Sequence, residues 1–208
     1  KVISTDGEST NFKMVKVARV AVAIQKLIIK RAVSFCFGNK PLYNSTPENE
    51  QEKAVAFALE RIMHDVKCKS LNRKIGRSIF GYKECAEYWY PVEKKHGKYG
   101  FPSQYKMRCT IFSPELGDTL YPYFDETGDM VAFSRSFSRN IKGVATNYFE
   151  TFTDTEHWLW MNGANGFDVV EGYPQNSAIG KIPVIDGHQP EFETEDVNAL
   201  IDRLEELL

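Results

Sequence analysis

The sequence predicts an α+β fold: N-terminal helices, one of them long, then an antiparallel β-meander of five or six strands, then a C-terminal helix. Three observations support this order. Residues 14–83 carry apolar side chains at helical spacing, whereas residues 84–172 show short aromatic and β-branched runs separated by polar turns. Helical spacing returns after residue 194, so helices and strands are segregated along the chain.

The first helix is expected to be the longest. Residues 1–13 are polar and are predicted to form a flexible arm. Residues 14–37 carry apolar side chains on much more than one stripe, which predicts a long helix that is buried on several sides. Gly38 and then Pro41 are expected to end this helix, because neither residue favours its continuation.

Two shorter helices are predicted next. Thr46 is expected to cap a helix that begins at Pro47 and runs to about residue 66. The apolar face of this helix consists of Val55, Ala58, Ile62 and Val66. A third helix over residues 70–80 places Leu71, Ile75 and Ile79 four residues apart. These segments make residues 14–83 the helical part of the chain.

The turns of the predicted meander are so short that only antiparallel neighbours can form. Strands are predicted over residues 84–92, 105–112, 119–126, 129–137, 144–153, 156–161 and 166–172. An extended connector over residues 173–193 completes the meander part, residues 84–193. Thr194 is expected to cap a final helix over residues 194–208. Because this helix has no stop signal, we expect it to continue and the chain to be a fragment.

Charge is distributed unevenly along the chain. Residues 1–104 hold 19 basic and 10 acidic side chains, a net charge of +9, whereas the second half holds 7 and 18, a net charge of −11. Such asymmetry often marks proteins that assemble or that handle polyanions. The same difference in net charge would arise if the two halves of the chain simply formed opposite, solvent-exposed sides of one molecule.

Cysteine usage and hydropathy indicate the compartment. The four cysteines, at positions 36, 68, 85 and 109, form no CxxC pair, so we expect buried thiols and a reducing environment. Five basic residues interrupt the apolar residues 14–37, and this stretch therefore does not predict a membrane span.

Motifs for catalysis are missing from the sequence. It has no GxxxxGK[ST] or GxGxxG loop, no GxSxG elbow and no HExxH pair, so we assign no catalytic residue, cofactor or metal site. His157 begins a strand and is interpreted as half of a polar cross-strand pair. The carboxylates that could suggest a glycosidase lie in hairpin turns, where their hydrogen bonds favour the turn. These are Asp125, Glu126, Asp129, Asp154 and Glu156.

Two candidate binding surfaces remain. Trp158 and Trp160 share one face of a strand, which indicates either the core of a sheet or a platform for sugars or bases. A basic face could neutralise phosphates, face solvent or meet the acidic half of a neighbouring copy. This basic face consists of Lys67, Lys69, Arg73, Lys74 and Arg77. The alternatives to an assembly protein are therefore a carbohydrate-binding or glycan-processing domain and a nucleic-acid-binding module.

Four stretches carry a family resemblance. The first is the end of the long helix, with Phe35, Phe37, Gly38 and Pro41, and the second is NRKIGRSIFGY at residues 72–82. The third is Gly180, Lys181, Ile182 and Pro183 before Val184, and the fourth is the helix over residues 197–208. In their order and spacing, these stretches resemble the SPP1-type (gp6-like) family of bacteriophage portal proteins.

The resemblance implies a structural protein of a phage or prophage, without enzyme activity. Such proteins form a ring, usually of twelve copies, at one vertex of the capsid, through which double-stranded DNA is packaged and ejected. Terminase, capsid or scaffold proteins and head-completion proteins are the implied partners, and no membrane is involved. Assembly in the host cytoplasm would place the protein in the virion. This chain would be the wing region, with the channel-lining residues outside it, and its basic face would contact a neighbouring subunit.

Overall fold

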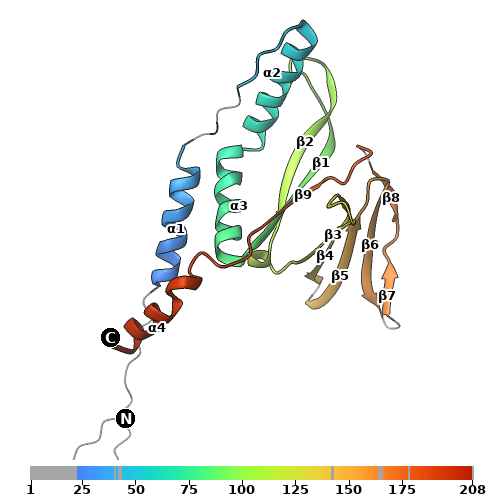
Figure 1. Cartoon of the computed structure of the whole chain (residues 1–208). Helices are drawn as coiled ribbons and strands as arrows, with labels where there is room; N and C mark the ends of the chain where they lie inside the picture. Colours follow the sequence, from blue (N-terminus) through green and yellow to red (C-terminus); the bar gives the residue numbers. More distant parts are fainter. Residues whose placement is uncertain are drawn as a thin grey trace, which may run out of the picture.

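The computed structural model describes residues 23–39, 41, 44–141, 143–163, 166–177 and 179–207. It confirms the α+β class, because helices precede an antiparallel meander and a further helix follows it. Figure 1 shows the elements as layers, with helices on one side, a three-stranded sheet in the middle and a six-stranded sheet on the other side. The predicted arm and the first part of the long helix lie outside the described residues.

Three helices form the N-terminal part of the described chain: α1 (Ile24–Phe37), α2 (Glu50–Asp65) and α3 (Cys68–Tyr82). α1 ends where the sequence predicts, immediately before Gly38. Gly38 keeps right-handed helical angles, with φ −64°, so the helix does not end in a left-handed glycine turn. A Cβ at this position would lie 2.5 Å from the carbonyl oxygen of Ser34, which explains why glycine is suited there.

The start of α2 differs from the prediction. Thr46 and Pro47 precede the helix, and Asn49 is the N-cap. The Asn49 side chain accepts a hydrogen bond from the Glu52 amide at 2.9 Å and donates one to the Glu52 carboxylate at 2.8 Å. This reciprocal pair gives hydrogen-bond partners to groups in the first turn of α2, which Thr46 cannot reach from its position. The predicted apolar face is buried only in part, because Val55 is 68% exposed.

The predicted strands divide into two antiparallel sheets. The three-stranded sheet has the order β2-β1-β9, with β1 (Glu84–His96), β2 (Ser103–Phe112) and β9 (Val184–His188). The meander contains, in chain order, β3 (Thr119–Phe124), β4 (Met130–Ile141), β5 (Val144–Phe152), β6 (Glu156–Gly163) and β7 (Gly166–Val169). β8 (Gln175–Asn176) pairs with the start of β6 as a sixth strand. The connector predicted as extended thus supplies β8 and β9.

The core lies between the two sheets. Phe112 of β2 meets Phe133 and Phe152 of the meander, and all three side chains are at most 2% exposed. The ring of Tyr88 lies between them, with its centroid 4.7 Å from that of Phe152. The helices cover the other face of the three-stranded sheet, where Ser78 of α3 donates a hydrogen bond to the Glu84 carbonyl at 3.0 Å. The layer order is therefore helices, three-stranded sheet, meander.

The end of the chain also departs from the prediction. Thr194 is buried and makes no side-chain capping hydrogen bond. It precedes a 3-10 turn, η2 (Glu195–Val197), and the α-helix α4 (Asn198–Leu207) begins only after this turn. Another 3-10 turn, η1 (Pro114–Leu116), joins β2 to β3.

The cysteines are less buried than the sequence predicts. No disulfide is present, and Cys85 is buried as expected, with its pKa raised to about 12 by burial. Cys36 is exposed, although its neighbours are aromatic. None of the helices in the described part of the chain has the length and apolarity needed to cross a membrane.

Candidate functional site

The basic face predicted from the sequence is a continuous feature of α3. Four of its residues lie on one exposed arc of the helix: Lys69, Arg73, Lys74 and Arg77. Three of them follow each other at four-residue spacing, which places them on one stripe. Lys67 stands immediately before the helix as its N-cap, in a left-handed conformation with φ 55°. The side of α3 that carries Leu71 and Ser78 is buried, so the basic face is turned to solvent.

α1 enlarges this charged surface. It packs along α3 and adds the exposed side chains of Lys26, Lys30 and Arg31. Neither helix contains an aspartate or a glutamate. Within the described residues, none of the cations of the two helices takes part in an ion pair. We call α1 and α3 together the basic helical side; the sequence analysis used the α1 charges only to exclude a membrane span.

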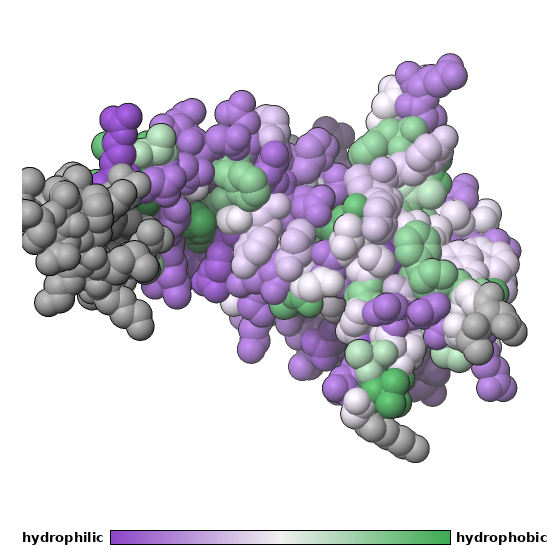
Figure 2. Space-filling model, turned by 90° about the horizontal axis from the view of Figure 1, so that it is seen from below, coloured by the Kyte–Doolittle hydropathy of each residue, from purple (hydrophilic) through white to green (hydrophobic). Residues whose placement is uncertain are grey.

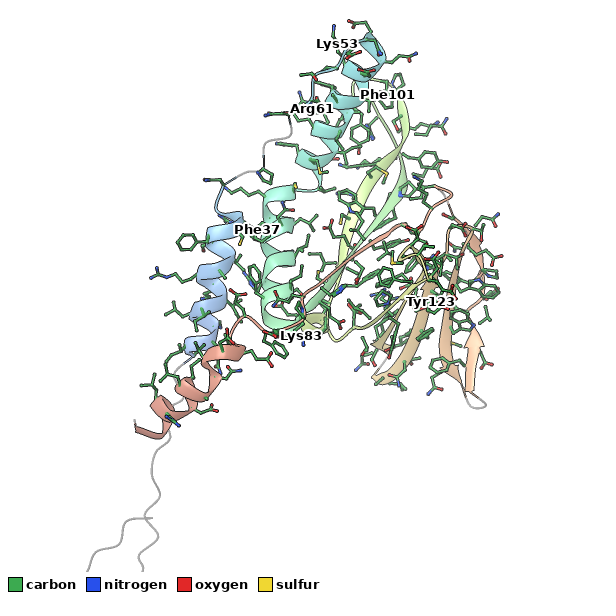
Figure 3. The ribbon with its side chains drawn as sticks, in the orientation of Figure 1. Phe37, Lys53, Arg61, Lys83, Phe101 and Tyr123 are labelled. Atoms are coloured by element: carbon green, nitrogen blue, oxygen red, sulfur yellow. The ribbon has the colours of Figure 1, made fainter. Side chains whose placement is uncertain are left out.

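The first two stretches of the family resemblance meet between these helices. The ring of Phe37 lies between α1 and α3 (Figure 3) and packs directly on Gly76, where an added Cβ would lie 2.3 Å from a ring carbon. Arg73 donates a hydrogen bond from Nε to the Phe37 carbonyl at 3.2 Å. Phe35, by contrast, is 89% exposed. The motif therefore holds α1 on α3 through Phe37 and leaves Phe35 on the surface.

The third stretch of the resemblance enters the core between the sheets. Gly180 adopts φ 60°, in the left-handed region that favours glycine, and Lys181 is exposed. Ile182 then packs against the core, and the Pro183 carbonyl accepts a hydrogen bond from the Trp89 amide at 2.8 Å. This stretch thus begins β9 and fixes its position beside β1.

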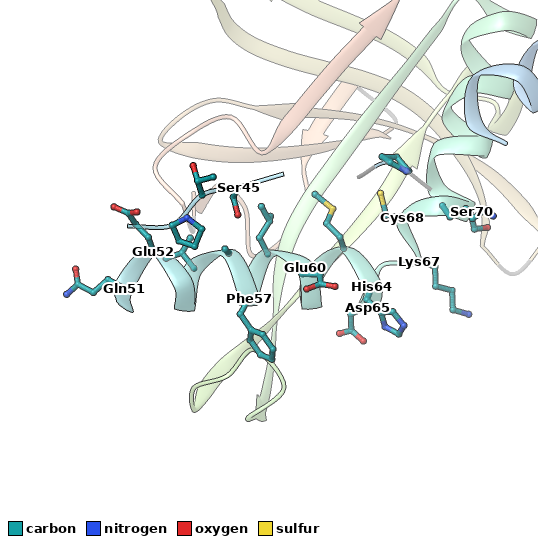
Figure 4. A pocket seen from close by; sticks show the side chains of 18 of the residues that line it. Ser45, Gln51, Glu52, Phe57, Glu60, His64, Asp65, Lys67, Cys68 and Ser70 are labelled. Atoms are coloured by element: carbon teal, nitrogen blue, oxygen red, sulfur yellow. The ribbon is translucent and has the colours of Figure 1, made fainter. Parts of the chain in front are cut away.

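An open groove lies beside the basic face. It has a volume of about 1620 Å³ and is lined by α2, by the chain before it, which includes Pro41, and by the start of α3 (Figure 4). Glu52 and Glu60 contribute carboxylates to its wall, whereas Lys69 and Arg73 of the basic face line its other end. The groove therefore combines both charges with apolar surface, and it continues the basic face.

A buried polar network, which sequence reasoning missed, ties the meander together. Arg135 of β4 donates from Nε to Glu150 at 2.6 Å and from Nη1 to Asp118 at 3.1 Å. Its guanidinium lies over the ring of Phe112, 3.6 Å from the centroid. Strand alternation could have revealed this network, because Arg135 lies two residues from the buried Phe133 and therefore on the same face of β4.

The predicted cross-strand pair belongs to the same network. His157 of β6 forms a 2.7 Å hydrogen bond with the Glu150 carboxylate of β5. Burial by itself would raise the pKa of Glu150, but the hydrogen bond to His157 and the charge of Arg135 outweigh burial and lower it. His157 also lines a small cavity of about 320 Å³ between the sheets.

The remaining candidates from the sequence have structural roles. The Asp125 carboxylate accepts hydrogen bonds from the Thr127 and Asp129 amides, at 2.8 and 2.9 Å, as expected for a turn. Trp158 and Trp160 do share one face, but the expectation that they form the sheet core is wrong. The core side of β6 carries the buried Leu159, so the two tryptophans lie on the opposite, outer face.

The described residues hold no cluster of three or more His, Cys, Asp or Glu side chains that could bind a metal ion. Comparison with models of protein families gives a match over almost the whole chain. The model of one family, described as "Phage portal protein, SPP1 Gp6-like", matches residues 8–208. No curated protein matches the chain. The match includes all four stretches on which the resemblance rests.

Proposed function

The chain belongs to the SPP1 Gp6-like family of phage portal proteins, and we propose that it is the wing portion of a subunit that assembles into a portal ring. The ring, of twelve copies, would stand at one vertex of the capsid, and DNA would be packaged and ejected through it. The observation that carries this proposal is the family match over residues 8–208, which leaves only the first seven residues outside it.

The portal family is structural, and the function we propose depends on position rather than on a reaction. In a ring, each subunit meets its neighbours through two different surfaces, which must be complementary. The basic face supports one half of such a contact, because its cations are exposed and carry no compensating carboxylate on the same helix. We therefore assign the basic face, Lys67 to Arg77, to the contact with a neighbouring subunit.

Further partners follow from the proposed ring. Double-stranded DNA would pass through its channel, mainly along parts of the protein outside this chain. Terminase, capsid or scaffold proteins and head-completion proteins would dock on the ring. Assembly would take place in the cytoplasm of the bacterial host, and the finished protein would reside in the virion.

Charge reversal tests the basic face as a subunit contact. In the full-length protein that carries this chain, Lys69→Glu, Lys74→Glu and Arg77→Glu are combined. Arg73 is left unchanged, because it also bonds to the Phe37 carbonyl within the subunit. We expect rings to be lost in native mass spectrometry while the circular dichroism spectrum of the subunit is kept, since the changed side chains are exposed.

A matched variant separates this effect from a general change of charge. Lys94→Glu, Lys95→Glu and Lys98→Glu reverse three exposed cations on the β1–β2 hairpin, outside α1 and α3. This control is expected to keep its rings. If the α3 variant forms rings as well as the control does, the basic face is not a subunit contact.

A further inference from the structure

The outer face of the meander is a sheet of aromatic rings that none of the described elements covers. The ring centroids of Tyr121 and Phe149 are 5.8 Å apart, and those of Phe149 and Trp160 are 5.9 Å apart. Trp158 stacks on Trp160 at 5.5 Å with an interplanar angle of 6°, and Phe167 meets Phe149 edge-on at 6.4 Å. The rings thus form a row from β3 across to β7. We call this set the outer aromatic face: Tyr121, Tyr123, Phe149, Trp158, Trp160 and Phe167.

This face is far more exposed than the other side of the same sheet. Tyr121 is 47%, Tyr123 66% and Phe167 57% exposed, whereas Phe133 and Phe152 on the inner side are at most 1% exposed. Small side chains on β4, Ser134 and Ser136, stand between Tyr121 and Phe149 and let the rings approach each other. Seen from below in Figure 2, the meander end of the molecule mixes green, pale and purple residues, whereas the helical end is mainly purple. A contiguous patch of this kind marks an interaction site.

Among the residues that the structure describes, the charged side chains around the outer aromatic face are carboxylates. The described part of the face contains no lysine or arginine, because Arg135 and Arg139 lie on the inner side, over the ring of Phe137. Glu156 accepts a hydrogen bond from the indole of Trp158 at 3.0 Å and so stands on the face. The turns at its rim add exposed carboxylates: Asp125, Glu126, Asp129 and Asp154. The face is therefore aromatic with an acidic rim.

The basic helical side is its counterpart. It carries seven cations and no carboxylate on α1 and α3, together with the exposed apolar side chains of Leu27 and Phe35. The two surfaces lie at opposite ends of the layer order, with both the three-stranded sheet and the core between them (Figure 1). They cannot meet within one chain. Two complementary surfaces on opposite sides of one molecule are what a head-to-tail contact requires.

We propose that the outer aromatic face docks on the basic helical side of a second copy of this chain. This inference rests on the proposed ring and names both surfaces of its wing contact. Guanidinium and ammonium groups are attracted to the faces of aromatic rings, and the acidic rim complements the cations that flank them. Repeated around a rotation axis, the contact closes into a ring and leaves neither surface exposed.

Cross-linking of introduced cysteines tests this contact in the full-length protein. With Cys36→Ser removing the exposed native thiol, Tyr123→Cys is combined with Lys74→Cys, and in a second variant Phe167→Cys is combined with Lys30→Cys. A short bismaleimide is expected to give a ladder of covalent multimers in at least one variant. The matched control combines Lys74→Cys with Tyr105→Cys, whose native side chain is 54% exposed on β2, outside the outer aromatic face. We expect no ladder there.

The outcomes distinguish this inference from the proposed function. Rings in native mass spectrometry without a ladder from either variant would overturn the inference and leave the portal ring standing. Covalent dimers from Tyr123→Cys alone would overturn it too, because the face would then pair with itself. The inference would also be overturned if changing Lys69, Lys74 and Arg77 to Glu abolished binding of double-stranded DNA but left portal rings intact. Absence of rings from the unsubstituted protein contradicts the proposed function itself, and the inference with it.

Removal of aromatic side chains from this face gives a second test of the contact. Tyr123→Ser combined with Phe167→Ser deletes two exposed aromatic side chains. We expect the protein concentration needed to form portal rings to rise at least about tenfold. Tyr105→Ser removes an exposed tyrosine elsewhere and is expected to leave ring formation unchanged. Equal behaviour of the two variants would show that the outer aromatic face takes no part in assembly.

Discussion

Arg135 connects the meander to the loop that precedes it. Its guanidinium bonds to Glu150 on the neighbouring strand and to Asp118 after η1, while Phe112 and Phe137 cover its two sides at 3.6 and 4.1 Å. The second Asp118 oxygen accepts a hydrogen bond from the Ser113 amide at 2.9 Å. Two buried carboxylates thus share one arginine, and Glu150 has His157 as a further partner.

Replacement of this cation should be costly. Arg135→Met keeps an unbranched side chain of similar length but removes the cation that both buried carboxylates contact; Asp118 then keeps its bond from the Ser113 amide, and Glu150 its bond to His157. Removal of one member of a buried ion pair lowers the free energy of unfolding by about 3–5 kcal/mol. We expect a loss of this size in urea unfolding. Arg139→Met is the control: it removes an exposed arginine that also lies over Phe137, 4.9 Å from the centroid, and should cost less than about 1 kcal/mol.

For individual residues, the sequence predicted local roles better than it predicted contacts with residues distant in the chain. The turn role of Asp125 and the pairing of His157 followed from local rules, and the structure confirms both. The Arg135 network was not found, although its parity with Phe133 and that of Glu150 with Phe152 place both charges on the inner face. Recognising it required knowledge of which strands are neighbours and of where Asp118 lies.

Among the elements, the contact between α1 and α3 depends on one glycine. The Phe37 ring occupies the position where a side chain on residue 76 would begin. Gly81 lies on the same helix, but a Cβ there would meet Ile29 only at an ordinary 3.7 Å. The two positions differ in packing while they share the same secondary structure.

Alanine at these two positions should therefore have opposite effects. Gly76→Ala forces Phe37 away from α3, and overpacking of this kind lowers the free energy of unfolding by about 1–3 kcal/mol. Gly81→Ala adds helix propensity without a clash and should raise it by up to about 1 kcal/mol. Urea unfolding of both variants measures the difference. Equal stabilisation by the two alanines would show that Phe37 does not pack on Gly76.

The elements themselves were largely predictable, and their pairing was not. Hydrophobic periodicity located α3 and the strands of the meander, because these signals are local. The three-stranded sheet is completed by β9, whose partner β1 lies about 100 residues earlier in the chain. Pairing between such distant segments leaves no periodic signal, so the residues of β9 looked like an extended connector.

For the whole molecule, the uneven charge of the sequence becomes a difference between two sides. Seven cations of the first half lie on α1 and α3, whereas carboxylates of the second half line the rim of the outer aromatic face. The sequence contained both charge groups, but their placement on opposite outer layers follows from the layer order of the fold. This arrangement gives the assembly proposed for this family member a physical basis.

Electron microscopy of the full-length protein tests the central claim, that this chain is the wing of a portal ring, most directly. We predict closed rings with a central hole, in which this chain lies at the periphery and the meander of each subunit faces α1 and α3 of the next. Dissociation at high salt is expected to be stronger than for a purely apolar contact, because the contact pairs opposite charges. Monomers or open chains at all protein concentrations would contradict the account.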